Sequence, residues 1–141
     1  MLNLMDSFEH SVDNKGRLVL PSVHRDLYRH GGVLSLRGDH LALYDPASWT
    51  VFMERLRVLR DEQTLSRSEF NSILGSSSEV TPDAQGRIGI SARIRAAARI
   101  EDKVVILGVD DYLAVYRPDA VPSPEMPELA DLMSKLDGLG L

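Results

Sequence analysis

The chain repeats one short pattern after an interval of 70 residues. The first copy reads VDNKGRLVLP from Val12 to Pro21, and the second reads PDAQGRIGIS from Pro82 to Ser91. Each copy has an Asp, three further residues of which the last is Gly, then an Arg and an apolar run. Repetition at a fixed interval indicates that one structural unit is used twice. The fold must therefore hold two equivalent units within 141 residues.

The match extends beyond the two turns. At the same offset the chain aligns Glu9 with Glu79, Asp13 with Asp83, Gly16 with Gly86, Arg17 with Arg87, Arg25 with Arg95, and Arg29 with Arg99. After a shift of two residues, LALYDP aligns with LAVYRP. We therefore predict a first unit at residues 7–49 and a second at residues 78–118.

Each unit has the signals of a strand, a tight turn, a second strand, a short helix and two closing strands. Asp accepts hydrogen bonds from the backbone of a turn, and Gly permits positive φ. We predict that these turns are structural, formed by Asp13 and Gly16 in one unit and by Asp83 and Gly86 in the other. Ser91 is a candidate N-cap for the short helix of the second unit.

Two helices are predicted between the units, over residues 46–75. The first begins with Asp45 as N-cap and Pro46 in the first turn. The second opens with the capping-box pair Ser66 and Glu69, and Gly75 is a stop signal.

The last segment, residues 119–141, is acidic and contains prolines that oppose a regular helix at VPSPEMP. Helical spacing then places four apolar side chains on one side, namely Leu129, Leu132, Met133 and Leu136. This segment is able to pack on the body, on a neighbouring subunit, or on neither.

Composition narrows the function. The absence of cysteine excludes disulfides and thiol chemistry and fits a reducing cytosol. No run reaches the roughly 18 apolar residues of a membrane-spanning helix, so no membrane association is expected. The four histidines lack metal-ligand spacing, and no phosphate-binding loop is present, so we expect no metal and no cofactor.

The paired Asp13 and Asp83 raise an enzymatic alternative, a carboxylate dyad of the kind used by aspartic proteases. Each Asp, however, stands at the same distance from a Gly-Arg pair. We favour carboxylates that hold their turns and pair with Arg17 and Arg87.

The basic residues are the stronger functional signal. A net charge of −5 argues against nucleic-acid binding, but the acidic residues are concentrated after Pro118. Arg, the side chain best suited to phosphates and guanine edges, dominates the basic residues. The first part of each repeat unit is mildly basic. Either DNA contact or a solvated face with internal ion pairs would explain this charge. DNA contact would require several copies of such a weakly basic segment.

The segment EHSVDNKGRLVLP with its short helix resembles the DNA-binding strand-turn-strand of AbrB-type swapped-hairpin barrels. Two such units, joined by helices ending in LGSSSEV, resemble the MraZ family of bacterial transcriptional regulators. The hallmark of that family is one DxxxR motif per half, here DNKGR and DAQGR. The resemblance covers residues 7 to 118.

The resemblance implies an α+β fold in which two pseudo-symmetric AbrB-like swapped-hairpin units form one barrel, joined by a helical hairpin. It implies a ring-shaped homo-oligomer, an octamer or similar, that binds double-stranded DNA and is not an enzyme. The targets would be direct repeats in the promoter of the division and cell-wall gene cluster, which the protein would repress or otherwise tune. The protein would act in the bacterial cytoplasm, on the nucleoid.

Carried over by position, the DNA-binding residues would be Lys15, Arg17 and Arg87, with Asn14, Arg25 and Arg95 as further candidates. The second copy lacks the Lys of the first, so we expect the first copy to dominate DNA contact. An alternative is an AbrB-like antitoxin or protein-interaction module that uses the acidic C-terminal tail.

Overall fold

The computed structural model describes residues 4–122 and 126–141. Pro124 and Glu125 of the predicted acidic tail lie outside these residues. The first unit contributes the strands β1 (Ser7–Ser11), β2 (Arg17–Val19), β3 (Gly32–Leu36) and β4 (His40–Tyr44). The second unit contributes the strands β5 (Ser77–Val80), β6 (Arg87–Gly89), β7 (Lys103–Gly108) and β8 (Tyr112–Tyr116).

The helical elements follow the same order in both units. A short helix follows the second strand of each unit, η1 (Ser22–Tyr28, a 3₁₀ helix) and α3 (Ala92–Ala97). The remaining helices are α1 (Pro46–Asp61), α2 (Arg67–Gly75), η2 (Pro118–Ala120) and α4 (Met126–Gly138). Helix α4 starts inside VPSPEMP because a proline in the first helical turn lacks only an N–H that would be unpaired there.

Six strands form one antiparallel sheet in the order β1-β7-β8-β4-β3-β5. The two central strands come from different units, with Leu43 of β4 opposite Leu113 of β8. The outer strands are exchanged, because β1 of the first unit pairs with β7 and β5 of the second unit pairs with β3. The two units therefore share one sheet rather than forming two adjacent sheets.

The remaining strands, β2 and β6, form a separate two-stranded ribbon. Two further bonds close its ends, from the Leu20 N–H to the Gly86 carbonyl at 2.9 Å and from the Ile90 N–H to the Gly16 carbonyl at 2.8 Å. This pairing also joins one unit to the other.

The mixed α+β class is confirmed, but the prediction that the sheet closes into a barrel is wrong. The hydrogen-bonded ladder of six strands is open, with β1 and β5 at its edges. A barrel needs a continuous, staggered ladder. The ribbon strands β2 and β6 span three residues each and pair with each other, so they do not carry the ladder from β1 to β5.

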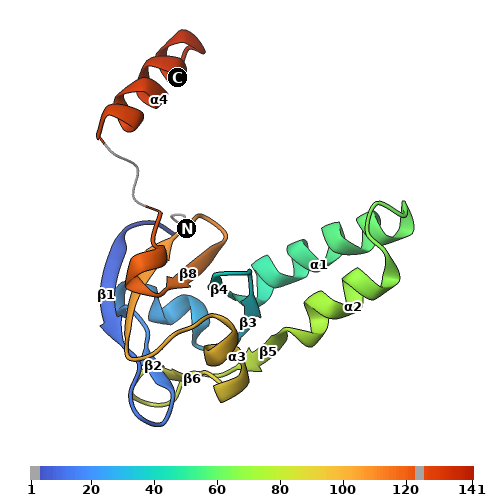
Figure 1. Cartoon of the computed structure of the whole chain (residues 1–141), viewed down its shortest axis with the longest axis vertical. Coiled ribbons are helices and arrows are strands. Elements are labelled where there is room, and N and C mark those ends of the chain that lie inside the picture. Colours follow the sequence, from blue (N-terminus) through green and yellow to red (C-terminus); the bar gives the residue numbers. More distant parts are fainter. Residues whose placement is uncertain (1–3, 123–125) are drawn as a thin grey trace.

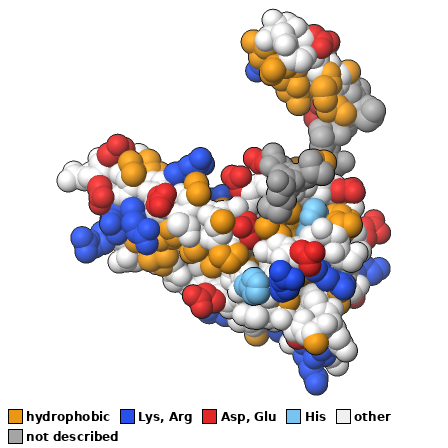
Figure 2. Space-filling model, turned by 180° about the vertical axis from the view of Figure 1, so that it is seen from behind, with side chains coloured by type: hydrophobic (Ala, Val, Ile, Leu, Met, Phe, Trp, Pro, Cys, Tyr) orange, Lys and Arg blue, Asp and Glu red, His pale blue; other side chains and the backbone are white. Residues whose placement is uncertain are grey.

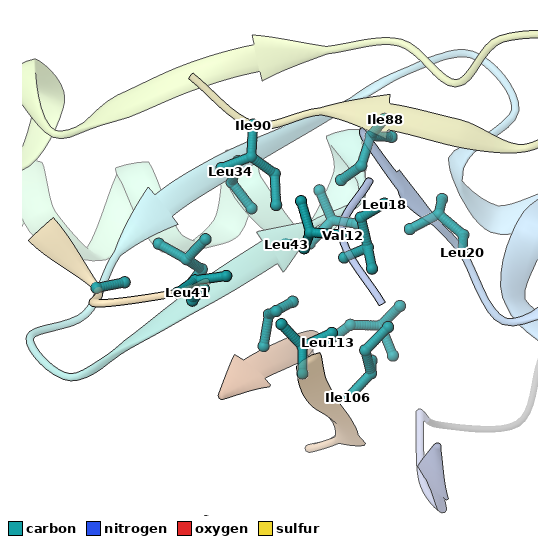
Figure 3. Packing of buried hydrophobic residues seen from close by; sticks show 14 of the residues in the cluster. Val12, Leu18, Leu20, Leu34, Leu41, Leu43, Ile88, Ile90, Ile106 and Leu113 are labelled. Atoms are coloured by element: carbon teal, nitrogen blue, oxygen red, sulfur yellow. The ribbon is translucent and has the colours of Figure 1, made fainter. Parts of the chain in front are cut away.

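One apolar core fills the space between the ribbon and the sheet (Figure 3). From the ribbon, Leu18 and Ile88 are completely buried and point toward side chains of the sheet, including Leu43 and Leu113. Because neighbouring side chains of a strand alternate between faces, the residues flanking Leu18 and Ile88 face outward.

The helices α1 and α2 form an arm that extends from the sheet (Figure 1). Both predicted caps are confirmed. The Ser48 N–H donates to Asp45 at 3.4 Å, and Ser66 and Glu69 bond each other's backbone N–H at 3.0 and 2.9 Å. A small second core of Met53, Leu56 and Phe70 holds the two helices together. Helix α4 stands apart from the sheet in the same view.

Candidate nucleic-acid interface

The turn between β1 and β2, here called the first tip, is built around Asp13. One oxygen of its carboxylate accepts the backbone N–H groups of Lys15 and Arg17, both at 2.9 Å. The other oxygen accepts the side-chain Nε–H of Arg17 at 2.8 Å. Gly16 completes the turn with a φ of 77°, which residues with a Cβ rarely adopt.

The turn between β5 and β6, here called the second tip, repeats this geometry. Asp83 accepts the backbone N–H groups of Gln85 and Arg87 at 2.9 Å, and the Arg87 Nε–H at 2.7 Å. Gly86 has a φ of 76°. The two DxxxR motifs therefore form the same structure, in which the Asp fixes both the turn and its Arg.

The surroundings of the two carboxylates suit this structural role. The backbone N–H of Arg17 holds the pKa of Asp13 below its ordinary value, and the N–H of Arg87 does the same for Asp83. A dyad that shares a proton needs one carboxyl group with a raised pKa. Each carboxylate is instead occupied by hydrogen bonds from its own turn.

The register of the ribbon brings the two motif arginines together. Arg17 lies opposite Gly89, and Arg87 lies opposite Val19, so the two arginines occupy diagonal positions. Such positions are about 7–8 Å apart between Cα atoms. Leu18 lies between them in register and faces the core, so both arginines lie on the outer face.

The terminal nitrogens of these two guanidinium groups make no protein hydrogen bond within residues 4–122 and 126–141. Each Asp thus orients its Arg through Nε and leaves the end of the guanidinium group open to a ligand. Gly89, opposite Arg17, adds no side chain beside it. A Gly inside a strand is typical of a close approach by another group, so the sequence carries a signal for this position that the prediction of site residues does not include.

The short helices exchange arginines between the two tips. Arg95, from α3 of the second unit, donates its Nε–H to the Ile90 carbonyl at 3.1 Å. A Cβ added to Gly16 would come within 2.9 Å of the Arg95 Cζ, so this guanidinium lies against the first tip.

Arg25, from η1 of the first unit, makes the matching contact with the second tip. Its Nε–H donates to the Leu20 carbonyl at 3.1 Å, and a Cβ on Gly86 would lie 2.7 Å from that Nε. Arg29 and Asp26 line the adjacent hollow together with the second tip. Each tip is therefore built by both units, which a reading of either unit alone does not reveal.

The two tips differ in charge. At the first tip Arg17 pairs with Asp13 and Arg95 lies against Gly16. The exposed Lys15, beside the exposed Asn14, adds a third basic side chain. Figure 2 shows Lys and Arg side chains at the lower end of the molecule, where the β1–β2 turn lies in Figure 1.

At the second tip the basic side chains are Arg87 and Arg25, and the exposed Ala84 and Gln85 add no charge. The ribbon and both tips form one continuous surface, and this surface is a candidate site for binding a polyanion.

Within the described part of the chain, no group of acidic, His or Cys side chains is arranged to hold a metal ion. Among the same residues, no helix is long and apolar enough to cross a membrane.

Comparison with known proteins gives one consistent family. A family model described as "MraZ protein, putative antitoxin-like" matches residues 4–68 and 73–120. A protein named transcriptional regulator MraZ from Thermomicrobium roseum is 32% identical over 113 residues, which cover 79% of this chain and 80% of that protein. Its namesakes from Mycobacterium avium and Mycolicibacterium smegmatis are each 31% identical over 117 residues, which cover 82% of both chains.

Proposed function

The chain belongs to the MraZ family, and we propose that it is a transcriptional regulator that binds double-stranded DNA through the β2–β6 ribbon and its two tips. The observation that supports this most directly is the diagonal pair Arg17 and Arg87 on the outer face of the ribbon. The Asp of each motif accepts a hydrogen bond from the Nε–H of its Arg and so fixes the side chain, which leaves the terminal nitrogens of the guanidinium group for a ligand.

The dimensions of a ribbon suit the major groove, which admits a two-stranded β-ribbon. Arg reads guanine by donating two hydrogen bonds to O6 and N7. We therefore propose base contacts for Arg17 and Arg87. Because phosphates flank the groove on both sides, Lys15, Asn14 and Arg95 at the first tip and Arg25 at the second would position the protein on the backbone.

The proposed function also includes an assembly of several chains and a DNA target. We propose that the exchanged strands are the AbrB-like swapped-hairpin arrangement, and that several chains assemble into a ring-shaped homo-oligomer. So few basic side chains per chain neutralise too few phosphates for tight binding. A ring that engages several direct repeats at once raises the effective concentration of each weak contact. The proposed target is the promoter of the division and cell-wall gene cluster, repressed by the protein on the nucleoid.

The test uses the full chain and a fluorescent duplex from the region upstream of the protein's own gene. Fluorescence anisotropy is measured for the wild type, for Arg17→Ala, and for Arg57→Ala on the exposed side of α1 as a control with the same loss of charge. We expect the wild type to prefer the natural duplex over a scrambled one, Arg17→Ala to lose that preference, and Arg57→Ala to keep it. Equal binding by Arg17→Ala and wild type would overturn the proposed site.

A further inference from the structure

A groove lies where α1 leaves the sheet, beside the ends of β4 and β8. Its volume is about 490 Å³, and its walls combine aromatic, apolar and basic side chains with one acidic side chain, that of Asp111. Arg37 lies between two rings, with Cζ 5.0 Å from the centre of Phe52 and 5.4 Å from that of Tyr112, and it donates to the Tyr44 hydroxyl at 2.9 Å. Val51 is 47% exposed on the helical wall.

Helix α4 has the complementary properties. Leu129, Leu132, Met133 and Leu136 recur at the spacing of one helical face, and Leu132 and Met133 are about half exposed, at 49% and 50%. Figure 2 shows hydrophobic side chains along this helix. A helix of 13 residues is marginal in water unless its apolar face is packed, because nucleation of a helix is unfavourable. The helix therefore needs a surface to cover that face.

We propose that α4 of one copy docks in the groove of a second copy of this chain. An amphipathic helix binds an apolar groove through side chains at spacings i, i+3, i+4 and i+7, which is the spacing on α4. The charges also match. On α4 the acidic residues Glu128, Asp131 and Asp137 outnumber the one base, Lys135. Among the residues that line the groove, Arg37 and Arg55 outnumber the one acid, Asp111.

The placement of α4 favours a second copy over the chain's own groove, because Figure 1 shows α4 well away from the α1–α2 arm of its own chain. The groove lies at the end of the β4–β8 pair where Tyr44 faces Tyr112. The chain leaves the sheet toward α4 at the opposite end of that pair, where His40 faces Tyr116. A contact between the tail of one chain and the groove of the next is head-to-tail, so it builds a ring when the rotation closes. The inference thus deepens the oligomer of the proposed function but does not depend on DNA binding.

The experiment measures the mass of the full-length protein by size-exclusion chromatography with light scattering. Leu132→Glu on the apolar face of α4 is matched with Ser134→Glu. Val51→Glu in the groove is matched with Val58→Glu, because Val58 is a similarly exposed valine of α1 outside the groove. We expect Leu132→Glu and Val51→Glu to reduce the wild-type assembly to single chains. The two control variants are expected to keep the wild-type mass.

Mixing the two defective variants tests the direction of the contact. The Val51→Glu chain keeps its α4 and the Leu132→Glu chain keeps its groove, so the mixture should form pairs of one chain each. A monomeric wild type, an unchanged mass for either variant, or a mixture without pairs would overturn the proposal, and the last result would indicate docking within one chain or onto a different protein. Anisotropy on the upstream duplex is measured in parallel. Single chains that still prefer this duplex over the scrambled one would show that the DNA site is intact although assembly has failed.

Discussion

The guanidinium of Arg95 lies against Gly16, although these residues belong to different repeats of the chain. The reciprocal pair, Arg25 and Gly86, gives the second tip the same construction. Each DxxxR turn thus receives its own Arg from within the motif and another from the opposite unit. A substitution in one repeat is therefore expected to affect the tip of the other.

Replacing Arg95 by Ala tests this exchange. We expect Arg95→Ala to weaken binding to the upstream duplex about 5–30-fold, the effect of losing one charge-assisted contact of about 1–2 kcal/mol. The matched control is Arg93→Ala on the same helix, whose side chain donates to the Gly75 carbonyl instead. Urea unfolding of both variants separates lost contact from lost stability. Equal anisotropy curves for the two variants would argue against a role for Arg95 at the first tip.

Any side chain at Gly16, the glycine of the first tip, should destabilise the fold. Gly16→Ala places a Cβ 2.8 Å from the Ile90 carbonyl oxygen at a φ of 77°, so both sterics and backbone strain oppose it. We expect a loss of about 3 kcal/mol in the free energy of unfolding.

Gly38 is the control for this substitution, because its φ of 85° is similar while nothing lies within 4 Å of a new Cβ. Gly38→Ala should therefore show only the strain of a positive φ, about 1–2 kcal/mol. Equal midpoints of urea unfolding for the two variants would show that the tip has room to adjust.

The carboxylates of the tips should make stability depend on pH in the acidic range. Hydrogen bonds from Arg17 and Arg87 lower the folded-state pKa of Asp13 and Asp83 below their ordinary value of 3.8. Their contribution is therefore present in full well above pH 3.8, and it is lost as the pH falls through that value toward the folded pKa.

Urea unfolding measured from pH 6 to pH 3 checks this for wild type and for the Asp13→Asn, Asp83→Asn double variant. The wild type should lose more stability over this range than the variant does. Some loss should remain in the variant, because Asp39 and Glu69 also have lowered pKa values. Parallel curves would show that the two carboxylates are not linked to folding.

The first tip has a Lys that the second tip lacks, so removing it and adding its counterpart should change the salt dependence of DNA binding in opposite directions. Lys15→Gln should flatten the dependence of log affinity on log salt by about 0.9 per bound chain, because one phosphate contact is lost. Gln85→Lys, which gives the second tip the Lys of the first, should steepen it by a similar amount. Anisotropy titrations at several salt concentrations give both slopes. A slope that changes only at Lys15 would restrict phosphate contact to the first tip.

The stability of the α1–α2 arm should depend on the capping box of α2. Ser66→Ala removes the acceptor for the Glu69 N–H and is expected to cost about 1 kcal/mol in the free energy of unfolding. Ser68→Ala, two residues into the same helix, is the control and should be nearly neutral. A matching loss in the two variants would show that the cap contributes nothing beyond helix propensity.

The sequence predicted local structure best where one residue type has one strong role. Asp45, Ser66 and Ser91 were identified as N-caps, and each accepts the expected backbone N–H. The repeat likewise predicted two units with the same order of elements. Such signals depend on a few neighbouring residues, so they can be read without knowledge of the tertiary fold.

Pairing between distant segments was not predictable in the same way. A pattern of alternating apolar residues indicates a strand but does not name its partner, so the residue pattern alone does not pair β1 with β7 or β5 with β3. The barrel was inferred from resemblance, whereas the short strands β2 and β6 pair only as a ribbon. For the same reason Arg25 and Arg95 were identified as basic candidates while their position on the opposite tips was missed.

The exchange of strands has a consequence for the growing chain on the ribosome. Strands β1 to β4 are synthesised before any residue of β5 to β8, yet each of the four pairs with a strand of the second half. Until that half emerges, the first half has unpaired strand edges and an uncovered apolar face. Such edges invite pairing with another nascent chain. On neighbouring ribosomes of one message, such edges of adjacent nascent chains are therefore exposed to each other for as long as synthesis of the second half takes.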